Sequence, residues 1–213
     1  MLNSNKGLIF IVDISGYSQF IREVNPIEGM TVVRHLLNGI IAENHLRLNI
    51  SEIEGDAILF YQFGNPLALE AVLGQFTAML HSFQKILSGY RSKFPKVDKL
   101  SLKAVAHYGK MEEFEIDRFR KLYGNTLVDA HRLLKNSVPS STYVLVTTDY
   151  LQEVYKSPLD YSTTCGTYQC DLYDVGSLCY AYFPLDDYKF VNEENDHHLN
   201  VFSKSNVREK LPV

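Results

Sequence analysis

A run of apolar residues near the start of the chain, Leu8–Val12, ends at Asp13. Branched and aromatic side chains at consecutive positions predict a central strand, covered on both faces, over about Leu8–Asp13. Further along the chain, apolar residues recur at helical spacing, which predicts four helices and a short fifth one. These helices are expected at about 15–24, 28–45, 67–90, 125–136 and 149–155.

The remaining apolar segments have the composition of strands. They lie at about 46–54, 57–63, 100–108, 143–147, 167–175 and 178–184. Gly55-Asp56 predicts a tight turn that joins the first two of these strands into a hairpin. The charged segment 111–123 has two open interpretations, a hairpin arm or a flexible loop.

The order of these elements mixes hairpins with helical crossovers. This order favours an α+β fold with a ferredoxin-like core, in which helices flank a mixed or antiparallel sheet, over a doubly wound parallel sheet. The chain has 213 residues, of which 46% are hydrophobic. These values indicate one domain, expected over residues 1–186, followed by a polar C-terminal tail over 187–213.

Charge and hydropathy exclude several classes of protein. A net charge of -4 and a pI near 6.0 argue against a nucleic-acid-binding surface. The sequence has no apolar segment long enough to span a membrane and starts with polar residues, so we expect a cytoplasmic protein. Cys165, Cys170 and Cys179 are odd in number and lack CxxC spacing, which favours buried, reduced thiols over a metal or redox site.

Two acidic residues are the strongest candidates for chemistry. If the strand before Asp13 lies beside the hairpin that carries Asp56, both carboxylates emerge at one edge of the sheet and can bind Mg²⁺ or Mn²⁺. The backbone amides of Ser15, Gly16 and Tyr17 precede a helix and suit a pyrophosphate group. The alternative is structural: Asp13 caps the helix, and Asp56 only completes a hairpin turn.

Three segments resemble the motifs of the class III nucleotide cyclases, the adenylate and guanylate cyclase superfamily. Val12–Tyr17 is similar to the first metal motif, and Glu52–Ala57 is similar to the second, in which Gly-Asp ends a hairpin. Tyr123–Leu133 is similar to the third, an aromatic-Gly-x-Thr-Val-Asn-x-Ala-x-Arg-Leu pattern. The resemblance covers about residues 7–150 and indicates a divergent bacterial subfamily.

The resemblance implies a reaction and a set of roles. Asp13 and Asp56 would bind two divalent cations, with the Ile14 carbonyl as a further ligand, and a nucleoside triphosphate would be cyclised with release of pyrophosphate. Each family active site lies between two chains, so the resemblance also implies a homodimer. Arg132 falls at the position of the arginine that the partner chain supplies to stabilise the transition state.

The chain departs from the family pattern at several positions. Val128 occupies the position of the ribose-orienting asparagine, for which the neighbouring Asn125 is a weak substitute. Glu52 and Lys121 fall at the two base-selecting positions, but they could instead pair with each other. The implied functions therefore differ: an active cyclase, or a degenerate cyclase domain that binds a metal–nucleotide or serves as a dimerisation module.

Overall fold

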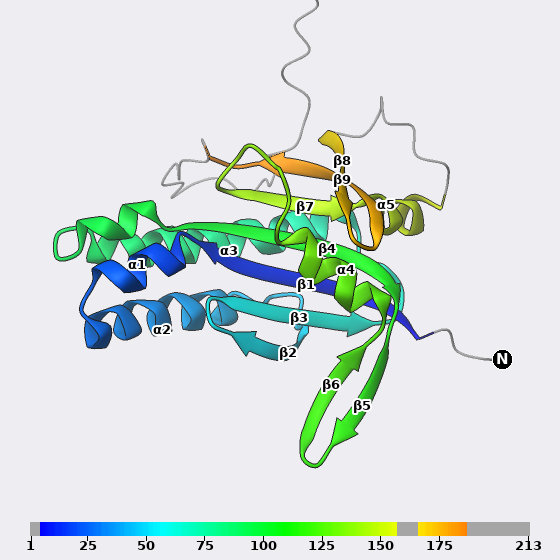
Figure 1. Ribbon diagram of the computed structural model, residues 1–213, viewed down its shortest axis with the longest axis horizontal. Helices are drawn as coiled ribbons and strands as arrows, with labels where there is room; N and C mark the ends of the chain where they lie inside the picture. The colour runs from blue at the N-terminus through cyan, green and yellow to red at the C-terminus, as the bar shows by residue number, and fades with distance from the viewer. Residues whose placement is uncertain (1–4, 157–165, 187–213) are drawn as a thin grey trace, which may run out of the picture.

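The computed structural model describes residues 5–156 and 166–186 and contains one large sheet with helices on both faces (Figure 1). The seven strands of this sheet lie in the order β2-β3-β1-β4-β7-β9-β8. Their bounds are β1 Lys6–Ser15, β2 Asn49–Glu54, β3 Ala57–Phe63, β4 Ser101–Lys110, β7 Tyr143–Thr147, β8 Thr167–Tyr173 and β9 Gly176–Pro184. The helices are α1 Tyr17–Glu23, α2 Pro26–Ala42, α3 Leu69–Tyr90, η1 Pro95–Lys99, α4 Asn125–Leu133 and α5 Thr148–Tyr155.

The pairing of the strands confirms the predicted α+β class. β1 lies between β3 and β4 and is antiparallel to both. Among the described strands of this sheet, β4 and β7 form the parallel pair, and every other neighbour is antiparallel. In this register Asp13 lies opposite Ala57 on one side and opposite Lys103 on the other.

Side chains of β1 alternate between two buried faces, as expected for a central strand. Leu8, Phe10 and Val12 pack in the main core with apolar residues of α1, α2, α3 and α5. Ile9 and Ile11 face the other way and pack in a second core that includes residues of α4. Asp13 continues this second series, so its side chain lies on the face of the sheet that α4 covers.

Of the two interpretations of residues 111–123, the structure shows the hairpin arm. β5 (Glu112–Ile116) pairs with β6 (Phe119–Tyr123) in a separate two-stranded sheet that projects from the body of the protein (Figure 1). Phe114, Ile116 and Phe119 remain exposed on this arm. The arm therefore carries apolar surface that the described part of the chain leaves exposed.

Local hydrogen bonds explain where the element bounds differ from the prediction. Helix α2 begins at Pro26 because the Asn25 side chain accepts a hydrogen bond from the Ile27 amide at 3.0 Å, and proline suits the first helical position. Strand β2 begins at Asn49, three residues later than predicted. The Asn44 side chain bonds both backbone groups of Leu48 and holds the preceding residues in a turn.

The expectation of reduced, buried thiols is wrong for two of the three cysteines. Cys170 and Cys179 lie directly opposite each other on β8 and β9 and form a disulfide. Sequence spacing missed this pair because only the register of the hairpin brings the two residues together. Cys165 and the predicted tail, 187–213, lie outside the described residues. Among the described helices, none combines the length and apolar character needed to cross a membrane.

Candidate functional site

The β1 strand and the β2–β3 hairpin bring Asp13 and Asp56 to the same end of the sheet. Asp13 lies opposite Ala57, the residue that follows Asp56. The Ile14 amide donates a hydrogen bond to the Asp56 carbonyl at 3.2 Å, which ties the hairpin turn to the end of β1. Gly55 occupies the first central position of this turn and has a φ of 61°, a conformation that favours glycine.

The structure argues against the alternative in which Asp13 only caps a helix. Asp13 lies within β1, and the residue at the start of α1 is Gly16, which provides no side-chain cap. Burial, followed by the negative charge of Asp13, raises the pKa of Asp56 to about 6. The two carboxylates are therefore close enough to repel each other, which is the electrostatic condition that a bound cation relieves.

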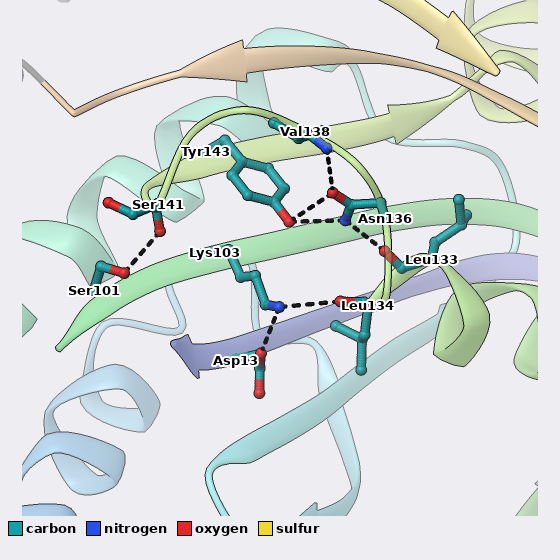
Figure 2. A network of polar contacts seen from close by, with 9 residues as sticks. All are labelled: Asp13, Ser101, Lys103, Leu133, Leu134, Asn136, Val138, Ser141 and Tyr143. Atoms are coloured by element: carbon teal, nitrogen blue, oxygen red, sulfur yellow. Dashed lines mark hydrogen bonds and ion pairs between the residues drawn. The ribbon is translucent and has the colours of Figure 1, made fainter. Parts of the chain in front are cut away.

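Lys103 is a member of this site that the sequence interpretation did not include. Its ammonium nitrogen lies 3.1 Å from Oδ2 of Asp13, and only about a sixth of each side chain is exposed, 17% and 16%. Figure 2 shows Lys103 reaching from β4 toward the Asp13 carboxylate on β1. A charged residue within the apolar run of a central strand was the signal in the sequence that could have identified it.

Lys103 also connects this site to helix α4. Its ammonium donates a second hydrogen bond to the Leu134 carbonyl at 3.0 Å, at the end of α4 where free carbonyls carry partial negative charge (Figure 2). The chain after α4 is held by Asn136, whose side-chain amide donates to the Leu133 carbonyl and to the Tyr143 hydroxyl. The carboxylate pair and the end of α4 thus form one connected unit.

The donor set fits a hard divalent cation. Two adjacent carboxylates supply oxygen ligands. When both are ionised, the group formed by the two carboxylates and the Lys103 ammonium has a net charge of −1. The described residues contain no cluster of three or more His, Cys, Asp or Glu side chains that could hold a metal. A cation at this site would therefore take its other ligands from water, from substrate phosphates or from a backbone carbonyl, such as the predicted one of Ile14.

The predicted phosphate-binding residues Ser15, Gly16 and Tyr17 follow Ile14, where β1 ends and α1 begins. Gly16 has a φ of 85°, and a Cβ there would lie 2.5 Å from the Lys99 carbonyl oxygen, so the turn requires glycine. α1 has only seven residues and hence a weak dipole. The helix end alone therefore offers little attraction for a phosphate, and the positive charge of Lys103 lies near the same end of β1.

Arg132 is not brought to the carboxylate pair within one chain. Its guanidinium forms a bidentate ion pair with Asp174 in the β8–β9 turn, with donor–acceptor distances of 2.6 and 2.7 Å. Val128, one turn earlier on α4, is 39% exposed, and Asn125 lies exposed at the first position of this helix. These α4 residues thus lie at or near the surface, where a second chain could meet them.

The two predicted base-selecting residues pair with each other. The Lys121 ammonium donates to Oε2 of Glu52 at 2.6 Å, which joins β6 of the arm to β2. Nε2 of His131 lies 3.9 Å from the other oxygen of Glu52. Of the two alternatives that the sequence left open, the structure therefore shows the intramolecular pair.

Several solved nucleotide cyclases have the same fold. The chain aligns with the adenylyl cyclase CyaB from P. aeruginosa with a TM-score of 0.62 and 16% identity, covering 84% of this chain and 94% of that one. It aligns with the guanylyl cyclase Cya2 with a TM-score of 0.61 and 14% identity, covering 83% and 90%. At these identities the likeness shows the fold alone, and it confirms the predicted architecture.

Sequence comparison gives two further matches. The chain is 30% identical over 107 residues to the uncharacterized protein Rv2561/Rv2562 of Mycobacterium tuberculosis, a match that covers 47% of this chain and 50% of that protein. The chain thus matches about half the length of this curated relative. The profile of the family described as protein of unknown function DUF2652 matches residues 33–143. The chain therefore belongs to the DUF2652 family and has the fold of the class III nucleotide cyclases.

Proposed function

We propose that the protein is a homodimeric nucleotide cyclase that converts a nucleoside triphosphate into a cyclic nucleotide and pyrophosphate. The observation that carries this proposal is the pair of adjacent carboxylates, Asp13 and Asp56, at one end of β1 in a chain with the cyclase fold. In this reaction the ribose 3′ oxygen forms a bond to the α-phosphorus, and the bond to pyrophosphate breaks.

Asp13 and Asp56 are the proposed ligands of Mg²⁺ or Mn²⁺, with the Ile14 carbonyl as a further ligand and two cations in each site. Such cations neutralise phosphate charge and favour ionisation of an attacking hydroxyl. Lys103 adds a positive charge from β4, and its ammonium can donate to a phosphate oxygen in place of Asp13. Ser15, Gly16 and Tyr17 are the proposed backbone contacts to the same phosphates.

The arginine of the reaction comes from the second chain in this proposal. Within one chain Arg132 pairs with Asp174, so this arginine does not stabilise charge on the α-phosphate in its own chain's site. Arg132 is partly exposed and the weaker candidate Asn125 is exposed on α4, so both can meet the site of a partner chain once Arg132 leaves Asp174. Base recognition by Glu52 requires its ion pair with Lys121 to open.

Apolar surface that residues 5–156 and 166–186 leave exposed supports a second copy as the partner. An apolar groove of about 640 Å³ lies along α1, α2 and β2, with Tyr17, Ile21, Met30 and Ile53 in its lining. In the proposed dimer, the exposed aromatic residues of the β5–β6 arm of one chain pack into the groove of the other. Tyr17 connects this groove to the predicted phosphate turn, so a dimer contact here would lie beside the site. A cytoplasmic location completes the proposal, because nucleoside triphosphates are found there.

One specific observation favours a second candidate function, a degenerate cyclase domain that binds a metal–nucleotide without turnover. Val128 stands at the family's asparagine position and offers no hydrogen bond to a ribose. Loss of one orienting donor in an active site typically costs about 3–4 kcal/mol of transition-state stabilisation.

The test is to incubate the protein with Mn²⁺ and each of the four ribonucleoside triphosphates, and to separate the products by chromatography with mass detection. We expect a cyclic nucleotide from at least one of them, and loss of that product in Asp13→Ala and in Asp56→Ala. Glu54→Gln is the matched control, because it removes an exposed carboxylate two residues from Asp56.

Calorimetry with a non-hydrolysable triphosphate separates the two candidates. Mn²⁺-dependent binding without any product supports the degenerate binding domain. Absence of both product and binding contradicts both functions.

A further inference from the structure

The β8–β9 hairpin is the edge of the large sheet and is fastened by a covalent bond. β8 is the last strand in the sheet, where it pairs with β9. Cys170 and Cys179 are opposite each other in this pair, and their disulfide closes the loop that contains the turn and Asp174. Cys170 is an exposed residue and Cys179 is partly exposed, so the disulfide lies in a hairpin that solvent contacts. An exposed bond at a sheet edge is accessible to exchange.

The closed loop holds the Asp174 carboxylate against Arg132. The pair is bidentate, yet 28% of the Arg132 side chain and 74% of the Asp174 side chain are exposed. The hydrogen bond from Arg132 lowers the pKa of Asp174, so this acid stays ionised. Exposed ion pairs alone hold side chains weakly. The position of Asp174 therefore depends on the hairpin that carries it.

A second contact fixes the same hairpin to the chain that follows α4. The Asp171 carboxylate accepts hydrogen bonds from the Ser137 amide at 2.9 Å and from the Tyr180 hydroxyl at 2.7 Å. Burial opposes ionisation of Asp171, but the hydrogen bonds from Ser137 and Tyr180 outweigh it and lower the pKa of this acid to about 2. The hairpin thus contacts both Arg132 on α4 and Ser137 just beyond it.

We propose that the Cys170–Cys179 disulfide is a thiol-exchange site that controls whether Arg132 is free to bind an anion. In the oxidised state the closed hairpin keeps Asp174 paired with Arg132. In the reduced state the edge strand opens more readily, Asp174 leaves, and the guanidinium becomes available. The consequence for catalysis rests on the proposed function, in which Arg132 stabilises phosphate charge in the partner's site.

The chemistry requires a dithiol reductant. One thiolate of the reductant attacks the sulfur of Cys170, the more exposed of the two residues, the Cys170–Cys179 bond breaks, and Cys179 leaves as a thiolate that takes up a proton. The second thiol of the reductant then attacks the mixed disulfide and releases Cys170. Two electrons and two protons pass to the protein, and the reductant becomes a disulfide.

The first experiment measures access to Arg132 and does not require cyclase activity. The protein carries Cys165→Ser, so that only the proposed pair can exchange, and is compared before and after reduction with dithiothreitol. Phenylglyoxal, an arginine-selective reagent, is added and modification is followed by mass spectrometry. We expect Arg132 to react about fivefold faster in the reduced protein, because a bidentate pair shields the guanidinium. Exposed Arg34 on α2 is the control and should not change.

Two variants make the result specific. Asp174→Asn should react fast at Arg132 in both redox states, since it removes the ionic partner and leaves the disulfide intact. The Cys170→Ser, Cys179→Ser double variant should match the reduced protein without any reductant. Hydrogen exchange in β8 should rise by about tenfold or more on reduction, because a disulfide restricts local opening.

Equal reactivity of Arg132 in the oxidised and reduced proteins would overturn the proposal. So would a free-thiol assay that finds no Cys170–Cys179 disulfide in the protein as isolated under air. If cyclase activity is found, reduction should raise it in the parent and have no effect in Asp174→Asn. If no activity is found in either redox state, the proposed function fails. The reactivity of Arg132 toward phenylglyoxal still tests whether the disulfide controls access to Arg132.

Discussion

The Lys103 ammonium lies 3.1 Å from the Asp13 carboxylate, across two adjacent antiparallel strands of the sheet. The same nitrogen donates to the Leu134 carbonyl, so one side chain joins the candidate metal ligand to the end of α4. This arrangement places a fixed positive charge beside two carboxylates that repel each other. Charge balance at this end of the sheet thus depends on Lys103 when no cation is bound.

Lys103→Met should destabilise the cation-free protein. Removal of the ammonium leaves the Asp13 carboxylate partly buried without its partner, and we expect a loss of about 1–3 kcal/mol in the free energy of unfolding. Urea unfolding in the presence of a chelator measures this change. Lys110→Met, at the exposed end of the same strand, is the matched control. Mn²⁺ should restore more stability to Lys103→Met than to the parent, and unchanged urea midpoints would contradict the role of Lys103.

Asp56→Asn should stabilise the cation-free protein at high pH and not at low pH. The pKa of Asp56 is raised from 3.8 to about 6, so the folded state binds a proton more tightly than the unfolded state does. Stability is therefore highest below the unfolded pKa, falls as pH rises through the interval up to about 6, and is constant above it. Because this side chain is partly exposed, solvent screening reduces the expected gain in Asp56→Asn at about pH 8 to about 1 kcal/mol.

Thermal unfolding of the parent and Asp56→Asn from about pH 4 to pH 8 measures this difference. A gain that is the same at every pH would show that ionisation of Asp56 is not its cause. Added Mn²⁺ should reverse the order of the two proteins at the high end of the range, because the cation stabilises only the carboxylate.

Gly16→Ala should destabilise the turn that follows Asp13. The positive φ of 85° and the 2.5 Å approach of a Cβ to the Lys99 carbonyl oxygen both oppose a side chain at this position. We expect a loss of about 1–3 kcal/mol, measured by chemical denaturation. Gly74→Ala is the control, because this glycine lies in α3 and a Cβ there would meet nothing within 4 Å. That control should be neutral or slightly stabilising, and equal effects of the two substitutions would contradict the strain at Gly16.

The Phe114→Ser, Phe119→Ser double variant should weaken the proposed homodimer. Both side chains are exposed on the β5–β6 arm, so their loss should leave the fold of one chain intact while reducing dimer affinity by about tenfold or more. Light scattering over a range of concentrations measures the association. Leu172→Ser removes an exposed apolar residue from β8 and should have no effect. A parent protein that is monomeric at all concentrations would contradict the two-chain site.

The amino-acid sequence was sufficient to predict most of the helices and strands and to locate the two carboxylates. Apolar runs and helical spacing are local signals, and they identified β1, the β2–β3 hairpin and the long helix α3 to within a few residues. Asp13 and Asp56 could be found because Asp13 follows an apolar run near the end of β1 and Asp56 lies in the turn between β2 and β3, so pairing of the strands brings them to the same end of the sheet. The sequence did not decide between a hairpin arm and a flexible loop for residues 111–123, because their exposed side chains follow no pattern of buried and exposed positions.

The partners in the ion pairs became evident only from the three-dimensional structure. Lys103 reaches Asp13, Lys121 reaches Glu52, and Arg132 reaches Asp174 over separations of 42 to 90 residues, and a residue's charge does not specify its partner. The Cys170–Cys179 disulfide likewise depends on strand register, which spacing in the sequence did not reveal. Helices and strands can be predicted from local periodicity, because the pattern involves residues that are near each other in the sequence. Ion pairs and disulfides between distant residues depend on the register of the strands in the folded sheet.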